Sequence, residues 1–127
     1  MAEKKLFDIE ERLVDFAARI IDVVEVLPNT RAENYIANQL VRCGLAPALL
    51  YGEVQGAESR EDFIHKMKIA VKELKETRVC LKIITRKEMI KPISRLDSVK
   101  KENEELIAIF SSSIETARKN IIKRKNK

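Results

Sequence analysis

The stretch from Tyr51 to Ile84, YGEVQGAESREDFIHKMKIAVKELKETRVCLKII, most constrains how this chain can fold. It joins the end of one helix, near Gly56, to a capped restart at Ser59 and then to a long amphipathic helix. No catalytic group interrupts the pattern. Apolar and small residues inside with charges outside predict a rigid helical hairpin, so the stretch indicates an architecture more clearly than an activity.

The composition favours a few long elements. Of the 127 residues, 45% are hydrophobic and 35% are charged, with three Gly, three Pro and no Trp. This composition is rich in helix formers and poor in turn residues, and the length suits one domain, residues 1–127, with its own core. No run approaches the roughly 20 apolar residues of a membrane span, and the N-terminus lacks a signal-peptide pattern. We therefore expect a cytoplasmic protein.

Four helices are predicted from apolar residues that recur at three- and four-residue steps, over residues of about 5–27, 31–55, 59–86 and 94–122. Thr30 with Glu33 and Ser59 with Asp62 have the spacing of helix caps. Gly56 predicts a left-handed stop after the second helix. Long helices joined by short links predict an all-α fold, an antiparallel up-down four-helix bundle.

The predicted core consists of one apolar stripe from each helix. Pro47 should bend or locally open the second helix, because it lacks an amide hydrogen and its ring clashes with the preceding turn. The stripes comprise Leu6, Ile9, Leu13, Phe16, Ala17, Ile20, Val24 and Leu27; Tyr35, Ile36, Leu40, Cys43, Ala46, Leu50 and Val54; Phe63, Met67, Ala70, Leu74, Thr77, Leu81 and Ile84; and Leu96, Val99, Asn103, Leu106, Ile109, Phe110, Ile114, Ala117 and Ile121.

Positive charge is concentrated in the second half of the chain. The net charges of residues 1–27, 28–57, 58–86 and 87–127 are −3, 0, +3 and +5. The last ten residues, RKNIIKRKNK, hold six basic and no acidic side chains and are expected to form a basic tail over 118–127. The candidate nucleic-acid-binding residues are Lys68, Lys72, Lys75, Lys82 and Arg86 of the third helix and Arg118, Lys119, Lys123, Arg124 and Lys125 of the tail.

Each of these basic features also has a simpler interpretation. Lysines on an exposed helix face are ordinarily solvated, and a basic terminus can serve solubility or complement the negative end of a helix. Apolar residues outside the core stripes are candidate subunit contacts, because a lone bundle would leave some of them exposed. They are Ile21, Val23, Val26, Leu45, Leu49, Val79 and Ile83.

Enzymatic and metal chemistry find little support in the sequence. Cys43 and Cys80 lie in helical patterns without a CxxC or Cys/His cluster, so we expect reduced core residues. His65 is the only histidine and is expected to be structural. No Gly-rich phosphate loop or nucleophile elbow occurs, and Glu76 is expected to pair with an arginine. We predict no catalytic residues, no metal and no cofactor.

The segment GAESREDFIHKMKIAVKELKET, with the LKII continuation, resembles the four-helix-bundle proteins associated with intervening sequences of bacterial 23S ribosomal RNA genes. The chain departs from the family pattern at Leu50, Gly52 and Cys80. The matching residues are Tyr51, Glu53, Ala57, Glu58, Ser59, Arg60, Asp62, Phe63, His65, Lys66, Ile69, Ala70, Lys72, Glu73, Glu76 and Thr77.

The resemblance implies more than the residues themselves establish. It implies an up-down bundle that assembles as a ring-like homo-oligomer, a homopentamer. Relatives include the accessory proteins of diversity-generating retroelements, which bind nucleic acid and a reverse transcriptase. Two hypotheses follow: an accessory protein that binds RNA or DNA backbones, or a structural scaffold for a protein partner with no nucleic-acid role. Steep salt dependence of binding is typical of the first.

Overall fold

A computed structural model describes residues 2–126, with side chains from Ile9 onward. Four long helices account for most of it: α1 (Ala2–Glu25), α2 (Arg31–Gln55), α3 (Arg60–Arg86) and α4 (Asp97–Lys125). A short 3₁₀ helix, η1 (Ile93–Leu96), precedes α4. No strand occurs in the described part of the chain. The fold is therefore all-helical, as the apolar periodicity predicts, and is a four-helix bundle.

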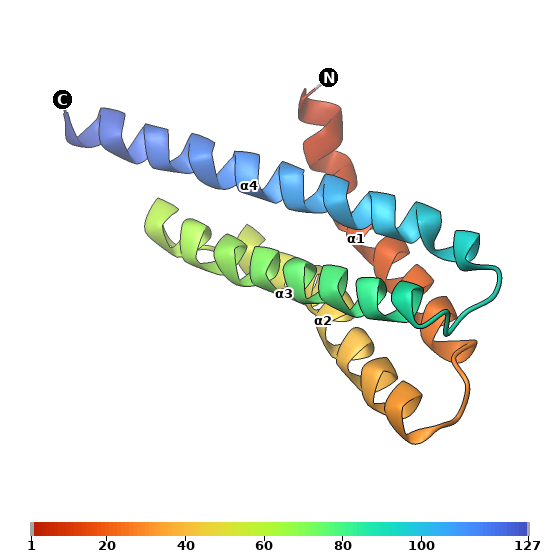
Figure 1. The fold of residues 1–127 in the computed structure, drawn as a ribbon. Helices are drawn as coiled ribbons and strands as arrows, with labels where there is room; N and C mark the ends of the chain where they lie inside the picture. Colours follow the sequence, from red (N-terminus) through yellow and green to blue (C-terminus); the bar gives the residue numbers. More distant parts are fainter. Residues whose placement is uncertain (1, 127) are drawn as a thin grey trace.

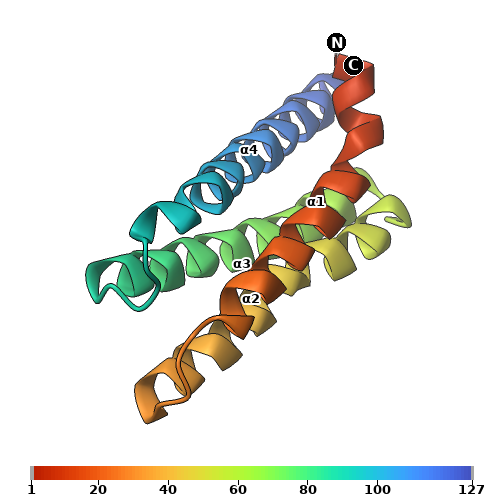
Figure 2. The same ribbon diagram turned by 90° about the vertical axis from the view of Figure 1, so that its right-hand side faces the viewer.

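The helices are arranged as two pairs whose members run in opposite directions. In Figure 1, α3 lies beside α4 along most of its length, while α1 is steeply inclined to both. Figure 2, turned by 90°, shows α1 lying along α2. The extensive contact of α2 with α3 joins the two pairs into one bundle. None of the described helices is both long and apolar enough to cross a membrane.

Both predicted helix caps are present. The Thr30 hydroxyl oxygen accepts a hydrogen bond from the Glu33 amide at 3.2 Å, and the Ser59 oxygen accepts one from the Asp62 amide at 3.0 Å. Gly56 ends α2 with φ −94°, so the prediction of a left-handed stop there is wrong. Its amide instead donates to carbonyls of the last turn, which a right-handed conformation also allows.

The C-terminal basic segment is part of a helix. The sequence predicts a tail over 118–127, but α4 continues through Lys125, and Lys127 lies outside the described residues. Positive side chains in the last turn of a helix face the negative end of its dipole, which favours helical structure there. The basic groups of this segment are therefore held on a fixed scaffold.

The predicted stripes form most of the core. Phe16, Leu40, Leu74 and Leu106, one from each helix, are fully buried, whereas some stripe residues such as Phe63 are half-buried. The side chain of Leu6 lies outside the residues whose side chains are described. Tyr35 is 67% exposed, so its assignment to the core is wrong. It lies near the start of α2, where the helix projects beyond its neighbours (Figure 1).

A glycine allows α1 and α2 to pack closely. A Cβ added to Gly44 would stand 2.8 Å from Ile20 Cγ2 and 2.9 Å from Ile20 Cγ1, nearer than van der Waals contact permits. Three residues later, Pro47 is buried inside α2, which is assigned as one uninterrupted helix. The local opening expected at Pro47 is therefore absent, although the proline leaves one backbone hydrogen bond unmade.

Five of the seven apolar residues predicted to be exposed are exposed, but so are Val14, Ile69 and Ile122, which were not predicted. Leu49, Val79, Ile21, Val26 and Ile83 are exposed at 75, 54, 42, 43 and 42%, respectively. Two other candidate subunit contacts are less exposed than predicted. Val23 is only 8% exposed and belongs to the core, and Leu45 is half-buried against it. Both point inward because the apolar faces of α1 and α2 are wider than a single stripe.

Candidate functional site

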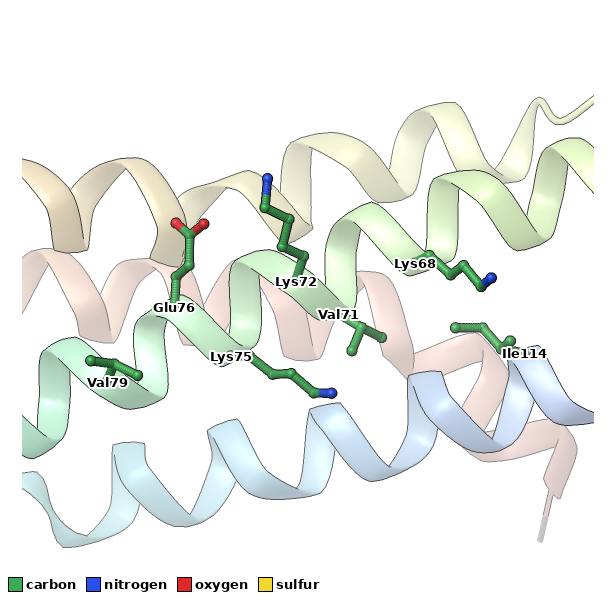
Figure 3. Close-up of a pocket in the computed structure, with 7 residues that line it drawn as sticks. All are labelled: Lys68, Val71, Lys72, Lys75, Glu76, Val79 and Ile114. Atoms are coloured by element: carbon green, nitrogen blue, oxygen red, sulfur yellow. The ribbon is translucent and has the colours of Figure 1, made fainter.

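Lys68, Lys72 and Lys75 of α3 line one groove, which we call the lysine groove. Its volume is about 480 Å³, and its other lining residues are Val71, Glu76, Val79 and Ile114. Figure 3 shows Lys68 and Lys75 directed toward α4 and Ile114, while Lys72 and Glu76 rise on the opposite side, toward α2. The spacing of four and three residues places the three lysines within about two turns of α3, on the two sides of the groove.

The lysine groove carries an excess of positive charge. None of its three lysines makes an ion pair with a described residue. Its one acid, Glu76, is engaged by Arg42 of α2 at 2.6 Å, and Arg42 also reaches Glu73 at 3.1 Å. The hydrogen bond with Glu76 raises the pKa of Arg42. The pairing expected for Glu76 is thus confirmed, and it leaves the lysine charges uncompensated.

The other candidate residues on α3 lie apart from this groove. Lys82 lines a second groove of about 370 Å³ between α3 and α4, which we call the Asn103 groove. Arg86 is exposed in the last turn of α3, beyond both grooves. Lys100 of α4, which the sequence reasoning missed, faces Lys82 across the Asn103 groove. The two lysines come together only because α3 and α4 pack antiparallel in this register. The sequence of either helix alone therefore does not predict their proximity.

The candidates on α4 occupy its last two turns, beside the start of α3. Arg118 forms an ion pair with Glu115 at 3.0 Å, and Arg124 reaches Glu61 of α3 at 3.7 Å. Lys119, Lys123 and Lys125 are exposed. Arg118 follows Ile114, a lining residue of the lysine groove, by one helical turn. The basic end of α4 therefore continues from the edge of that groove.

The two cysteines lie next to each other in the core between α2 and α3. Cys43 and Cys80 are both buried and unbonded, which confirms their assignment as reduced core residues. Interaction with the neighbouring Cys80 thiol lowers the pKa of Cys43 to about 7, whereas interaction with Cys43 and burial raise the pKa of Cys80. The Cys43 thiol donates a hydrogen bond to the Leu40 carbonyl at 3.8 Å.

Metal coordination is equally unsupported by the geometry of the described residues. They hold no group of three or more histidine, cysteine, aspartate or glutamate side chains with metal-site geometry. His65 is exposed near the start of α3. The neighbouring Asp62 accepts hydrogen bonds from Lys66 and the Glu58 amide, and these lower its pKa. The carboxylate of Asp62 thus caps the helix start.

Comparison with known proteins gives a family and a fold. The model of the 23S rRNA-intervening sequence protein family matches residues 5–112. A solved structure of a protein of unknown function, from the S23 ribosomal protein family of Bacteroides thetaiotaomicron, is 30% identical. The alignment covers 84% of this chain and 97% of that one, with a TM-score of 0.76. No curated protein matches the chain significantly.

Proposed function

Because the chain belongs to the 23S rRNA-intervening sequence protein family, we propose that it is a non-enzymatic cytoplasmic accessory protein that binds the phosphate backbone of RNA or DNA. The lysine groove is the observation that carries this proposal. Lys68 and Lys75 are seven residues apart, which is about 10 Å along a helix of 1.5 Å rise per residue. With strand phosphates about 3.4 Å apart along a duplex axis, that length corresponds to about three phosphates.

The chemistry of the groove supports binding with little base readout. Its floor is formed by the aliphatic side chains of Val71, Val79 and Ile114, and no aromatic ring lines it on which a base can stack. Contacts from lysines to phosphates position a strand without reading its sequence. The basic end of α4 extends the same positive field, so the longer strands should bind more tightly than short ones.

Fluorescence anisotropy across a salt series tests this proposal. Labelled structured RNA, duplex DNA and single strands are titrated with the wild type and with a variant carrying Lys68→Gln, Lys72→Gln and Lys75→Gln. If each lysine contacts one phosphate, the slope of log K against log salt becomes shallower by about 2 to 3, at roughly 0.7 to 0.9 per contact.

A matched variant controls for the overall loss of charge. Lys87→Gln, Lys91→Gln and Lys101→Gln remove the same three charges from exposed positions outside both grooves. This control should keep most of the wild-type slope. An equal loss in the two triple variants would show that net charge alone matters, and absence of binding at low salt would contradict the proposal.

We propose the second candidate, a homo-oligomeric scaffold, on the exposed apolar side chains. Leu49 is 75% exposed and Val79 is 54% exposed, so both side chains are accessible to a second copy of the chain. A ring-like homopentamer, as the resemblance implies, would cover such residues, and a reverse transcriptase is then the protein partner to test. Val79 also lines the lysine groove, so an interface that covers Val79 would compete with a strand bound in that groove.

Mass measurements test the assembly. We expect Leu49→Asp and Val79→Asp to reduce the oligomer mass in light scattering while circular dichroism shows that helicity is retained. Both positions are exposed, so the substitutions disturb little of the core. Lys101→Asp is a matched surface control that introduces the same side chain. An unchanged mass in both apolar variants would remove these residues from the interface.

A further inference from the structure

The Asn103 groove contains a buried polar side chain that lacks a partner. Its lining residues are Arg78, Leu81, Lys82, Lys100, Asn103 and Glu104, and its volume is about 370 Å³. Asn103 is 0% exposed. Its Nδ2 donates a hydrogen bond to the Leu74 carbonyl at 3.1 Å, but among the described buried side chains its Oδ1 is without any hydrogen-bond partner.

The unpartnered oxygen is energetically costly. A buried acceptor without a donor has lost its hydrogen bonds to water and gained none within the protein. Exchanging the two ends of the amide would not help, because it would place Oδ1 against the Leu74 carbonyl and break the bond that Nδ2 makes. The orientation is therefore fixed by α3, and the oxygen is free to accept a hydrogen bond from a donor that enters the groove.

The charged residues around the groove favour a ligand that carries a negative charge in addition to a hydrogen-bond donor. Arg78 and Glu104 neutralise each other through two hydrogen bonds of 2.7 Å each. Lys82 makes no ion pair with a described residue, and Lys100 contacts only the Thr85 hydroxyl, at 3.4 Å. Two positive charges from facing helices thus remain available at one opening.

We propose that the Asn103 groove binds a nucleotide, with the phosphate held by Lys82 and Lys100 and a base N–H donated to Asn103 Oδ1. The volume is within the range of small-ligand pockets and leaves room for a base as well as a phosphate. Leu81 is 1% exposed, so it becomes an apolar contact surface for the base only when side chains at the rim move aside. Because Oδ1 is covered in the free protein, side chains at the rim must move when the nucleotide enters.

This site is separate from the lysine groove and does not depend on the proposed function. A nucleotide reaches it either as a free nucleoside monophosphate or as one unit of a single strand, and both sources present the same phosphate and base. The lysine groove contacts phosphates only, whereas the Asn103 groove would also contact a base. Failure of mononucleotide binding would leave the salt-dependent binding of long strands untouched.

Calorimetric titration of the full chain with AMP, GMP, CMP and UMP, one at a time at low salt, tests the site. Lys82→Ala and Lys100→Ala should each weaken binding of the preferred nucleotide about tenfold, because each removes a charge-assisted hydrogen bond. Asn103→Leu should weaken it about fivefold through loss of one neutral hydrogen bond. Lys101→Ala, an exposed neighbour that lines neither groove, should bind as the wild type does.

Further ligands separate the base contact from the phosphate contact. Ribose 5-phosphate and inorganic phosphate should bind at least about tenfold more weakly than the nucleotide and should not respond to Asn103→Leu. Equal affinity for ribose 5-phosphate would overturn the assignment of a nucleotide. A short single-stranded oligonucleotide is titrated in parallel. If its affinity alone depends on Lys82 and Asn103, the nucleotide that occupies the groove is a unit of a strand and not a free mononucleotide.

The substitutions can be checked for folding independently. Lys82→Ala changes an exposed side chain, so it keeps the test valid even if Asn103→Leu unfolds the protein. Thermal melts followed by circular dichroism show whether Asn103→Leu is unfolded. If neither the mononucleotides nor the oligonucleotide respond to Lys82→Ala, the proposal is wrong, and Asn103 is then a polar residue that fixes the register of α3 against α4.

Discussion

Replacing Gly44 with alanine is expected to destabilise the protein, although alanine is the better helix former. In the interior of a helix, the exchange of Gly for Ala normally stabilises by about 0.5–1 kcal/mol. At Gly44 the new methyl group would stand 2.8 and 2.9 Å from the two γ carbons of Ile20. Ile20 is 0% exposed and β-branched, so its χ1 angle cannot change easily to make room.

The magnitude follows from these opposing effects. Overpacking of a filled core typically costs about 1–3 kcal/mol. Subtracting the gain in helix propensity leaves a net loss between about zero and 2.5 kcal/mol. Gly52, which also lies within α2, is the matched control because an added Cβ there meets no atom within 4 Å. Gly52→Ala should therefore stabilise by the full 0.5–1 kcal/mol or so.

The difference between the two alanine variants isolates the contact with Ile20, about 1–3 kcal/mol. Urea unfolding followed by circular dichroism gives both free energies by linear extrapolation. All samples need the same protein concentration, because assembly would shift the apparent stability by mass action. If Gly44→Ala stabilises as much as Gly52→Ala, then α1 and α2 are not held as closely as the geometry requires, and the reasoning is refuted.

Three further predictions concern a cap, an ion pair and the cysteines. Thr30→Ala should lower the unfolding free energy by about 1 kcal/mol in urea titrations, because the first turn of α2 loses its side-chain acceptor; no change would exclude the cap. Burial would raise the pKa of Glu102, but the hydrogen bond and charge of Arg12 outweigh it and lower that pKa. The stability from this pair is thus complete above the unfolded pKa of about 4.3 and lost as pH falls through the lower folded pKa. Arg12→Gln should cost about 1 kcal/mol at pH 7 and progressively less in acid melts; a cost independent of pH would contradict this. Cys43 and Cys80 are buried, so mass spectrometry should show iodoacetamide modifying them in urea but not in the folded protein; rapid labelling of the native chain would disprove their burial.

Much of the fold could be predicted from local patterns along the chain. Helical periodicity placed most of the core residues, and the spacing of Thr30 with Glu33 and of Ser59 with Asp62 placed two helix starts. These features depend on neighbours within a few residues, so they can be read from a single sequence. Gly56 shows the limit of such rules, because a glycine permits a left-handed conformation without requiring one.

The candidate site was predictable only in part. The alignment of Lys68, Lys72 and Lys75 follows from their spacing on one helix, whereas the approach of Lys100 to Lys82 depends on how α4 lies against α3. The neutralisation of Glu76 by Arg42 likewise requires the contact between α2 and α3. The charge remaining in a groove is a property of several helices together.

The sequence by itself determined the helical class, the approximate helix limits and the side of each helix that faces the core, because each depends on local periodicity and capping. The tertiary structure decided which helices pair, where the two grooves lie and which buried polar atom lacks a partner. Asn103 illustrates the difference: its spacing predicts burial, but only the position of the Leu74 carbonyl decides that one end of its amide is bonded and the other is not. Contacts between distant segments depend on packing geometry, which no short stretch of sequence specifies.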